Sequence, residues 1–407
     1  MTAQLAFRFH PSIQQLPAST WNGLVGSGNP FLRHEFLAAL ETSASVCADT
    51  GWQPHHLEVI REDQTVAVMP LYIKGHSYGE YVFDWSWADA YRQHGYQYYP
   101  KLLTAIPYTP SQAPRLLVAS SEDFEQMCAA ITKSVVQEAQ RLGASSWHTL
   151  FPTASQSACL ANNGAHQRMA TQFHWFNRDY ESFEHYLESF NSRKRKNLRK
   201  ERKAVREAGI TFERLSGQNI SAQLWDTFYQ FYENTYHVRG QQAYLTKGFF
   251  ESLGRTMPQN LVLVMAMKEA TPIAAALSLR DENTLYGRYW GSLEEYQFLH
   301  FETCYYQGIE YCIEQKLKSF DSGAQGEHKI QRGFEPISTY SNHWIADEQF
   351  DAAIADFLAK EKTYIEQYKE NASDYLPFKS QVKMGIRNFW LIKCQRCKEE
   401  NLSQRII

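Results

Sequence analysis

LVLVMAMKEATPIAAALSLRDENTLYGRYW (residues 261–290) opens the stretch from Leu261 to Glu335 around which the chain is organised. Its apolar runs and the polar residues between them predict three strands, over 261–267, 273–279 and 285–290. A helical pattern follows over 300–317, and then a short strand over 319–321 that opens into a polar loop. The order predicts an antiparallel meander, a helix, and a further strand whose loop carries functional residues.

An earlier segment repeats this pattern without repeating its residues. HLEVIREDQTVAVMPLYIKG (56–75) and GEYVFDWSW (79–87) predict three strands separated by polar turns, over 56–61, 66–74 and 79–85. A helical pattern over 97–105 comes next. The chain is therefore predicted to hold two similar units in tandem, with a boundary near residues 177–191.

Apolar periodicity places further elements around the two meanders. The predicted helices are 121–142, 180–208, 221–237 and 347–371, and the predicted strands are 147–151, 170–177, 210–214 and 340–344. The helix over 180–208 is strongly basic and would begin the second unit.

Length and composition limit the class of protein. The 407 residues exceed one ordinary core, so two domains are expected. A formal net charge of -3 excludes a global attraction to nucleic acid or membrane, and any such partner needs a local basic patch. Seven scattered cysteines predict free thiols. With neither a signal peptide nor an apolar run long enough to span a membrane, the expected location is the cytoplasm.

Five segments carry a resemblance to a known family. They are NPFLRHEFLAALE (29–41), PLYIKGHSYGEYVFDWSWADAY (70–91), YYPKLLTAIPYTP (98–110), FNSRKRKNLRKERKAVREAGI (190–210) and DSGAQGEHKIQRGFEP (321–336). On these segments the chain resembles the bacterial GNAT-like family of peptidoglycan biosynthesis/recognition, which is similar to the Fem-type transferases that add amino acids to peptidoglycan precursors. The resemblance implies an α/β (α+β) fold of two tandem GNAT-like acyltransferase domains, each a mixed, mostly antiparallel sheet flanked by helices.

The domain boundaries follow from the tandem pattern. We expect an N-terminal GNAT-like domain over 1–178, a C-terminal one over 179–375 that begins with the basic helix, and a basic tail over 376–407. The active site would lie in the cleft between the two domains. Oligomeric state does not follow from the sequence.

The loop after the last strand of the second unit concentrates charge and glycine. Its charged residues are Asp321, Glu327, His328, Lys329 and Arg332. Glu327 or His328 is predicted as a general base, Lys329 and Arg332 as anchors for a phosphate or carboxylate group, and Asp321 as a further substrate-binding residue. In the Fem-type pattern a catalytic-looking lysine aligns with Gln331, and Lys329 is two residues away. An exposed polar loop without chemistry is the alternative.

Two strand ends supply the remaining candidates for the site. In the first unit the candidate substrate-binding residues are Asp84, Trp85, Trp87, Asp89, Tyr91 and Arg92. In the second unit they are Arg288 and Trp290, next to Tyr289. The GNAT resemblance implies that two strands splay here and that backbone N–H groups near Tyr289 stabilise an oxyanion. Tyr289 or Tyr305 could protonate the leaving group, and the aromatic residues could instead be core.

The acyl donor is left open between acyl-CoA and aminoacyl-tRNA, with no permanently bound cofactor. GNAT enzymes hold the pyrophosphate of acyl-CoA in a glycine-rich loop at a helix N-terminus. The corresponding stretch here, SLEEYQFLHFE (292–302), lacks glycine and carries Glu294 and Glu295. Fem-type relatives lack that loop and use aminoacyl-tRNA.

The basic helix offers a candidate surface for phosphate or nucleic acid. Its candidate binding residues are Arg193, Lys194, Arg195, Lys196, Arg199, Lys200 and Lys203. They could bind tRNA, a nucleotide-sugar diphosphate or, peripherally, an anionic membrane. A solvated helix neutralised by acids elsewhere is the alternative.

The predicted activity is N-acyltransfer, in which an amine attacks an acyl or aminoacyl donor without a covalent enzyme intermediate. The acceptor would be a small or nucleotide-linked molecule such as a peptidoglycan precursor. The alternative is a binding protein that recognises a cell-wall precursor or RNA through a degenerate GNAT pair. Dispersed histidines and a lone Cys394–Cys397 pair predict no metal site.

Overall fold

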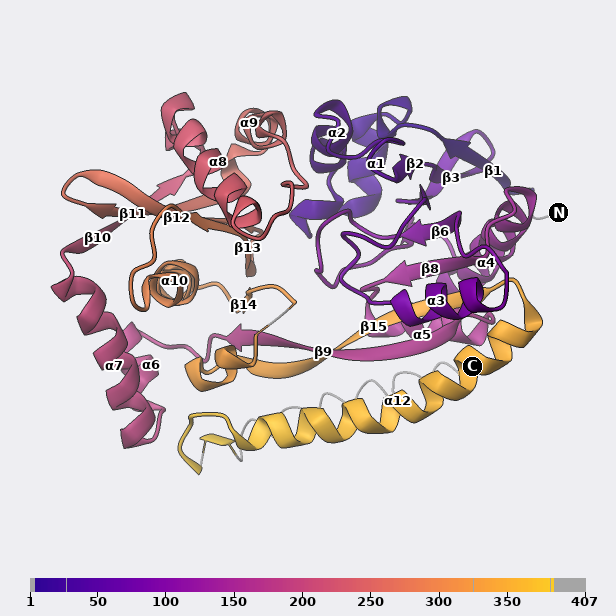
Figure 1. Ribbon diagram of the computed structural model, residues 1–407. Coiled ribbons are helices and arrows are strands. Elements are labelled where there is room, and N and C mark those ends of the chain that lie inside the picture. The colour runs from indigo at the N-terminus through magenta and orange to yellow at the C-terminus, as the bar shows by residue number, and fades with distance from the viewer. Residues whose placement is uncertain (1–3, 27, 325, 381, 384–407) are drawn as a thin grey trace.

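The computed structural model describes residues 4–26, 28–324, 326–380 and 382–383 (Figure 1). Cys394 and Cys397, and most of the predicted basic tail, lie outside these residues. Within them the chain forms two sheets, with helices on both faces of the larger one.

The larger sheet has 11 strands and runs through both halves of the chain. In spatial order its strands are β10 (Ile210–Ser216), β11 (Leu261–Lys268), β12 (Thr271–Arg280), β13 (Thr284–Ser292), β14 (Ser319–Asp321), β9 (His166–Phe176), β15 (Glu335–Ile345), β8 (Ser146–Leu150), β6 (Lys101–Thr104), β5 (Tyr72–Lys74) and β2 (Trp52–Pro54). The smaller sheet contains β1 (Ala6–His10), β3 (His56–Arg61), β4 (Gln64–Met69) and β7 (Leu117–Val118).

Twelve α-helices are present in the described part of the chain. They are α1 (Ala18–Val25), α2 (His34–Thr42), α3 (Trp85–Gln93), α4 (Phe124–Arg141), α5 (Ala154–Asn162), α6 (Phe183–Glu188), α7 (Ser192–Glu207), α8 (Ala222–His237), α9 (Lys247–Thr256), α10 (Leu299–Phe301), α11 (Gln307–Glu314) and α12 (Glu348–Asp374). A π-helical turn, η5 (Glu302–Tyr306), joins α10 to α11, and a 3₁₀ helix, η6 (Glu327–Arg332), follows β14. None of the helices in the described ranges is both long and apolar enough to cross a membrane.

The predicted meander of the second unit is confirmed. β11, β12 and β13 pair in antiparallel fashion, and β14 joins β13 in parallel. The hairpins β3–β4 and β11–β12 also share a detail, because the turns at Glu62–Asp63 and Glu269–Ala270 both have positive φ. Each of the two hairpins has a register shift next to its turn, so the repeat of pattern is real at this level.

Two predicted elements of the first unit are wrong. Residues 79–84 of the predicted strand over 79–85 form a loop that leads into α3, because Gly79 and Tyr81 have positive φ and break the extended chain. Residues 97–105 contain β6 and not a helix. All four residues of β6 are buried, and such a central strand cannot be told from a buried helix by periodicity alone.

Two other elements are interrupted. The strand predicted over 66–74 divides into β4 and β5 around Pro70, whose ring removes a backbone donor. The basic helix predicted over 180–208 divides into α6 and α7, where the side chain of Asn191 accepts a hydrogen bond from the N–H of Lys194 and caps α7.

The two halves are joined through strands and through a shared core. β9 lies between β14 and β15, and β15 pairs with β8, so the sheet crosses the predicted boundary at residue 178. Phe36 of α2 packs edge-on against Phe249 of α9, with ring centroids 5.5 Å apart. Leu376 and Phe378, at the start of the predicted tail, are buried in the core under α6 and α11.

Candidate functional site

The parallel pair β13–β14 opens at the centre of the large sheet. Pairing covers only Thr284–Tyr286 of β13 against Ser319–Asp321 of β14. On its other side β13 has a bulge, because Tyr289 pairs with Leu277 while Gly287 pairs with Ser278. Arg288 is therefore the extra residue, and a bulge of this kind redirects side chain and backbone locally.

A pocket of about 120 Å³ lies where these strands separate. Its lining comes from both halves of the chain: Tyr81, Tyr108, Pro110, Tyr232, Tyr236, Leu245, Gly287, Arg288, Tyr289, Ser322, Gly323 and Ala324. The first half contributes three of these residues, and the second half contributes the rest from α8, the loop before α9, β13 and the loop after β14. We call this set the inter-half pocket.

Arg288, which lines the inter-half pocket, forms a buried ion pair with Asp321. Arg288 Nη2 lies 2.5 Å from Asp321 Oδ2, and both side chains are almost completely buried. Asp321 also accepts hydrogen bonds from the N–H of Gly323 and from Ser111 Oγ of the first half. Burial alone would raise the pKa of Asp321, but the adjacent Arg288 guanidinium more than offsets this, and the pKa lies well below its usual range.

Two residues that line the pocket carry buried polar atoms without a hydrogen-bond partner. These atoms are Arg288 Nε and Ser322 Oγ. Buried donors are rarely left unpaired, so these two atoms are candidates for hydrogen bonds to a ligand with acceptor oxygens. The loop that carries Ser322 is held by Lys329, whose Nζ donates to the carbonyl oxygens of Ser322 and Gly323 at 2.9 Å. Burial lowers the pKa of Lys329 to about 8.

The other predicted residues of this loop lie beside the pocket and do not line it. His328 Nε2 is 2.9 Å from the hydroxyl of Tyr305. Burial, with Arg332 and Lys329 nearby, lowers the pKa of His328 to about 4, so its ring is neutral at pH 7. Arg332 binds Glu201 of α7, and Glu327 accepts a hydrogen bond from Tyr368 of α12. The structure thus brings His328 and Tyr305 together as a pair.

Tyr289 and Trp290, the two residues after the bulge, line different cavities. Tyr289 lines the inter-half pocket and packs against Phe250, with ring centroids 5.2 Å apart, and burial raises its pKa. Trp290 lines a separate groove of about 370 Å³ with Glu294, Glu295 and Tyr296 among its walls. Thr235 and Asn234 of α8 donate hydrogen bonds to the carbonyl oxygens of Trp290 and Ser292.

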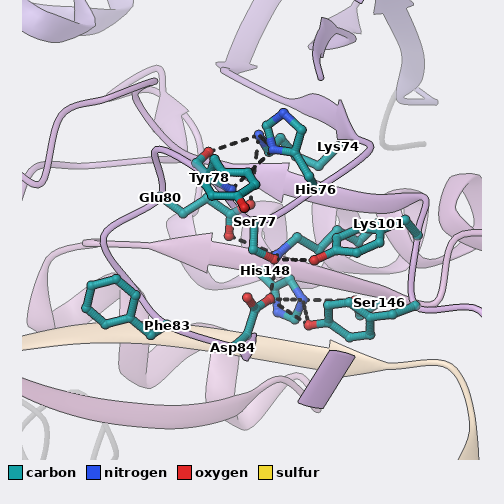
Figure 2. Close-up of polar contacts among 12 residues, drawn as sticks. Lys74, His76, Ser77, Tyr78, Glu80, Phe83, Asp84, Lys101, Ser146 and His148 are labelled. Atoms are coloured by element: carbon teal, nitrogen blue, oxygen red, sulfur yellow. Dashed lines mark hydrogen bonds and ion pairs between the residues drawn. The ribbon is translucent and has the colours of Figure 1, made fainter. Parts of the chain in front are cut away.

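The predicted residues of the first unit fall into a buried and an exposed set. Asp84 is buried, and Lys101 Nζ lies 2.5 Å from its Oδ2 (Figure 2). The Tyr98 hydroxyl lies 2.7 Å from the same oxygen. Trp87 and Tyr91 face inward from α3, and Tyr91 stacks on Phe350 with ring centroids 3.8 Å apart. Trp85 is partly exposed, and the remaining two predicted residues form an exposed ion pair between Asp89 and Arg92. None of the six lines the inter-half pocket.

Some of the cationic side chains of α7 form ion pairs or hydrogen bonds, and others have no acidic partner in the part of the chain that the structure describes. Arg202 is half-buried against Glu302 and Glu310. Arg199 pairs with Glu184 at the surface, Lys203 pairs with Glu207, and Lys194 bonds Gln331. Among the described residues, no acidic partner lies within ion-pair distance of Arg193, Arg195, Lys196 or Lys200. Part of the predicted basic surface is therefore free to bind an anion.

Sequence reasoning missed most of the aromatic wall of the pocket. Tyr81, Tyr108, Tyr232 and Tyr236 come from three separate segments, and nothing in their local patterns distinguishes them from core. The positive φ of Tyr81 and Tyr108 could not be read from the sequence either. Gly79 was the only signal in the sequence that two segments approach each other closely here. A glycine is needed at this position because a Cβ would lie 2.5 Å from the Tyr108 ring.

Comparison with known protein families shows which family the chain belongs to. The FemAB-like family, described as peptidoglycan biosynthesis/recognition, matches residues 12–380. The chain belongs to this family. A comparison with curated proteins gives no match.

Solved structures support the same fold for this FemAB-like chain. The C-terminal domain of a putative lysylphosphatidylglycerol synthetase from Agrobacterium fabrum aligns with a TM-score of 0.52 and 11% identity, over 84% of this chain and 95% of that one. FemX aligns with a TM-score of 0.51 and 13% identity, over 86% of this chain and 100% of FemX. The predicted fold class of tandem GNAT-like α/β units is confirmed, and the Fem-type resemblance with it.

His300, which lines the same groove as Trp290, predicts that the stability of this FemAB-like protein depends on pH. Burial, with His328 and two cations nearby, lowers the pKa of His300 to about 4. The unfolded chain binds a proton there near pH 6.5 and the folded chain only near 4, so stability present above pH 6.5 is lost as the pH falls toward 4. This group should contribute about 1–2 kcal/mol to the loss between pH 7 and pH 5.

Urea denaturation of the wild type and of His300→Asn at both pH values measures this contribution. The variant should lose less stability than the wild type by that amount. Other titrating groups change the stability of both proteins equally, so their effects cancel when the two losses are subtracted. One of them is Glu80, whose pKa burial raises to about 7, so that its protonation has the opposite effect on stability. An equal loss in both proteins would show that His300 does not titrate as its surroundings require.

Proposed function

We propose that this protein is an aminoacyltransferase that joins an aminoacyl group to an amine in the inter-half pocket. The observation that carries the proposal is the opened, bulged edge of β13, where Arg288 Nε and Ser322 Oγ are buried without partners. An ester carbonyl placed there would find donors ready for the oxyanion that forms on attack. Membership of the FemAB-like family supports the same reaction class.

The reaction needs no cofactor and no covalent intermediate. The nitrogen of the amine attacks the ester carbonyl, the C–N bond forms, and the C–O bond to the donor hydroxyl breaks. The proton lost by the amine ends on the leaving oxygen. His328 and Tyr305 stay the predicted carriers of that proton, since they form a hydrogen-bonded pair next to the loop that lines the pocket.

Aminoacyl-tRNA is the donor that the surroundings favour over acyl-CoA. Glu294 and Glu295 lie in the groove where a GNAT enzyme would hold the pyrophosphate, and like charge opposes that binding. Helix α7 instead offers unpaired cations, and its Lys194 contacts η6, the turn after the pocket loop. Helix α7 is therefore in direct contact with the segment that follows that loop.

Mass spectrometry of a reconstituted reaction tests the proposal. The protein is mixed with total aminoacyl-tRNA and a nucleotide-linked muropeptide, and in a parallel arm with acetyl-CoA in place of the tRNA. An acceptor heavier by one amino-acid residue, absent with Arg288→Gln, is the expected product. An acetylated product would overturn the choice of donor, and binding of the muropeptide without any product would favour the alternative, a recognition protein without chemistry.

A further inference from the structure

The loop between β5 and α3 carries buried charges that the proposed reaction does not use. Residues 75–84 contain Glu80 and Asp84, which are 4% and 2% exposed. Both face Lys101, the first residue of β6, which has no exposed surface. Figure 2 shows Lys101 extending between the two acids.

Lys101 binds this loop at three points. Its Nζ lies 2.9 Å from Ser77 Oγ, 2.9 Å from Glu80 Oε2 and 2.5 Å from Asp84 Oδ2. A second lysine, Lys74, lies over the Trp52 ring at 3.7 Å and donates to the carbonyl oxygen of Tyr78 at 3.3 Å. Buried lysine contacts therefore hold the loop at several points between Ser77 and Asp84.

Stability alone does not explain this arrangement. Removing two acids and two lysines from water costs several kcal/mol per ion, and apolar residues of similar size often serve as well. Glu80 Oε1 and Asp84 Oδ1 are buried without hydrogen-bond partners, which adds to that cost. What a multipoint ion network does supply is one defined path for the loop.

That path places Tyr81 in the wall of the inter-half pocket. Tyr81 follows Glu80 directly and has a φ of 61°, a conformation that a tyrosine holds only when its surroundings enforce it. Gly79, with a φ of 79°, lies against the ring of Tyr108, which stacks on Tyr244 of the second half at 4.9 Å. The anchored loop thus contributes Tyr81 to the wall of the pocket that Arg288 also lines.

We infer that Tyr81 determines the size of the group that the pocket accepts, and that Lys101 is a positioning residue that holds Tyr81 there. Small transferred groups fit beside the Tyr81 ring, and bulky ones are excluded by it. The inference rests on the proposed function for what the pocket holds. It adds a specificity residue and its support, both from the half of the chain that does not carry Arg288.

The ratio of kcat/KM for two donors tests this inference. With alanyl-tRNA and phenylalanyl-tRNA as probes, the wild type should favour alanine. Tyr81→Ala should raise the phenylalanine-to-alanine ratio at least about tenfold. A purely structural role would lower both rates together and leave the ratio unchanged, which would overturn the inference.

The anchor is tested by removing the charge of Lys101 and those of its two acidic partners together. The triple variant Lys101→Met, Glu80→Gln, Asp84→Asn removes all three charges, and Lys360→Met, which breaks an exposed ion pair on α12, is the matched control. In the triple variant the amides of residues 75–84 should exchange with deuterium at least about tenfold faster, and the donor ratio should move in the same direction as in Tyr81→Ala. The control should change neither.

Failure of the proposed function would be distinguishable from failure of this inference. If the wild type transfers no aminoacyl group, the proposed function is wrong and hydrogen exchange alone decides the anchor. Unchanged exchange of residues 75–84 in the folded triple variant would refute the positioning role of Lys101. Faster exchange together with an unchanged donor ratio would refute the link between the anchor and Tyr81.

Discussion

Asp321→Asn is expected to lower the free energy of unfolding by about 3–5 kcal/mol and to reduce transfer at least about 100-fold. The substitution leaves the Arg288 guanidinium buried without its counter-ion, and removal of one partner of a buried pair is far more costly than removal of both. It also weakens the contacts that Asp321 makes with Gly323 and Ser111, which join the pocket loop to the first half.

Guanidinium denaturation monitored by tryptophan fluorescence measures the stability change. Asp356→Asn is the matched control, because its ion pair with Lys360 is exposed and should contribute less than about 1 kcal/mol. The double variant Arg288→Met, Asp321→Leu should recover much of the lost stability but none of the activity. Recovery of activity in the double variant would show that the pair is only structural.

Charge reversal at two exposed lysines of α7 is expected to weaken tRNA binding by about 10–100-fold near 100 mM salt. Lys196 and Lys200 lie four residues apart on one face, and in the described structure neither has an acidic partner within ion-pair distance. Their replacement by glutamate therefore removes phosphate contacts without breaking an internal ion pair. The slope of log affinity against log salt should become shallower by roughly 2, one unit for each lost contact.

Fluorescence anisotropy with labelled tRNA over 50–300 mM salt measures both quantities. The control is Lys360→Glu, Lys362→Glu, which makes the same change in net charge on the exposed surface of α12. Binding should weaken far less in the control. An equal effect of the two double variants would mean that net charge, and not the α7 surface, governs the interaction.

Local patterns were sufficient for the second meander and insufficient for the segment that follows the first. Leu261–Lys268 and Thr271–Arg280 are long apolar runs bounded by turn residues, and both were predicted as strands. Lys101–Thr104 is only four residues long and its lysine is buried, so no local rule marks it as a central strand. What identifies it is its parallel pairing with β8, a contact between residues about 45 apart in the chain.

The residues of the candidate site also fall into those that the sequence could predict and those that it could not. Arg288, Tyr289 and Asp321 were predicted because a strand end and a glycine-rich loop are visible in sequence, and the structure brings Arg288 and Asp321 into contact. Whether any of them acts in catalysis stays a prediction. Tyr81 and Tyr108 could not be predicted, since their place in the pocket depends on how the two halves pack.

The sequence by itself determined the family, the tandem α/β plan, and the basic character of α7, because these depend on composition and on spacing along the chain. The tertiary structure alone decided where the bulge at Arg288 faces, which cations of α7 stay unpaired, and which tyrosines enclose the pocket. Those features depend on residues that are distant in sequence and on the burial of charge, and both become defined only when the two halves share one sheet and one core.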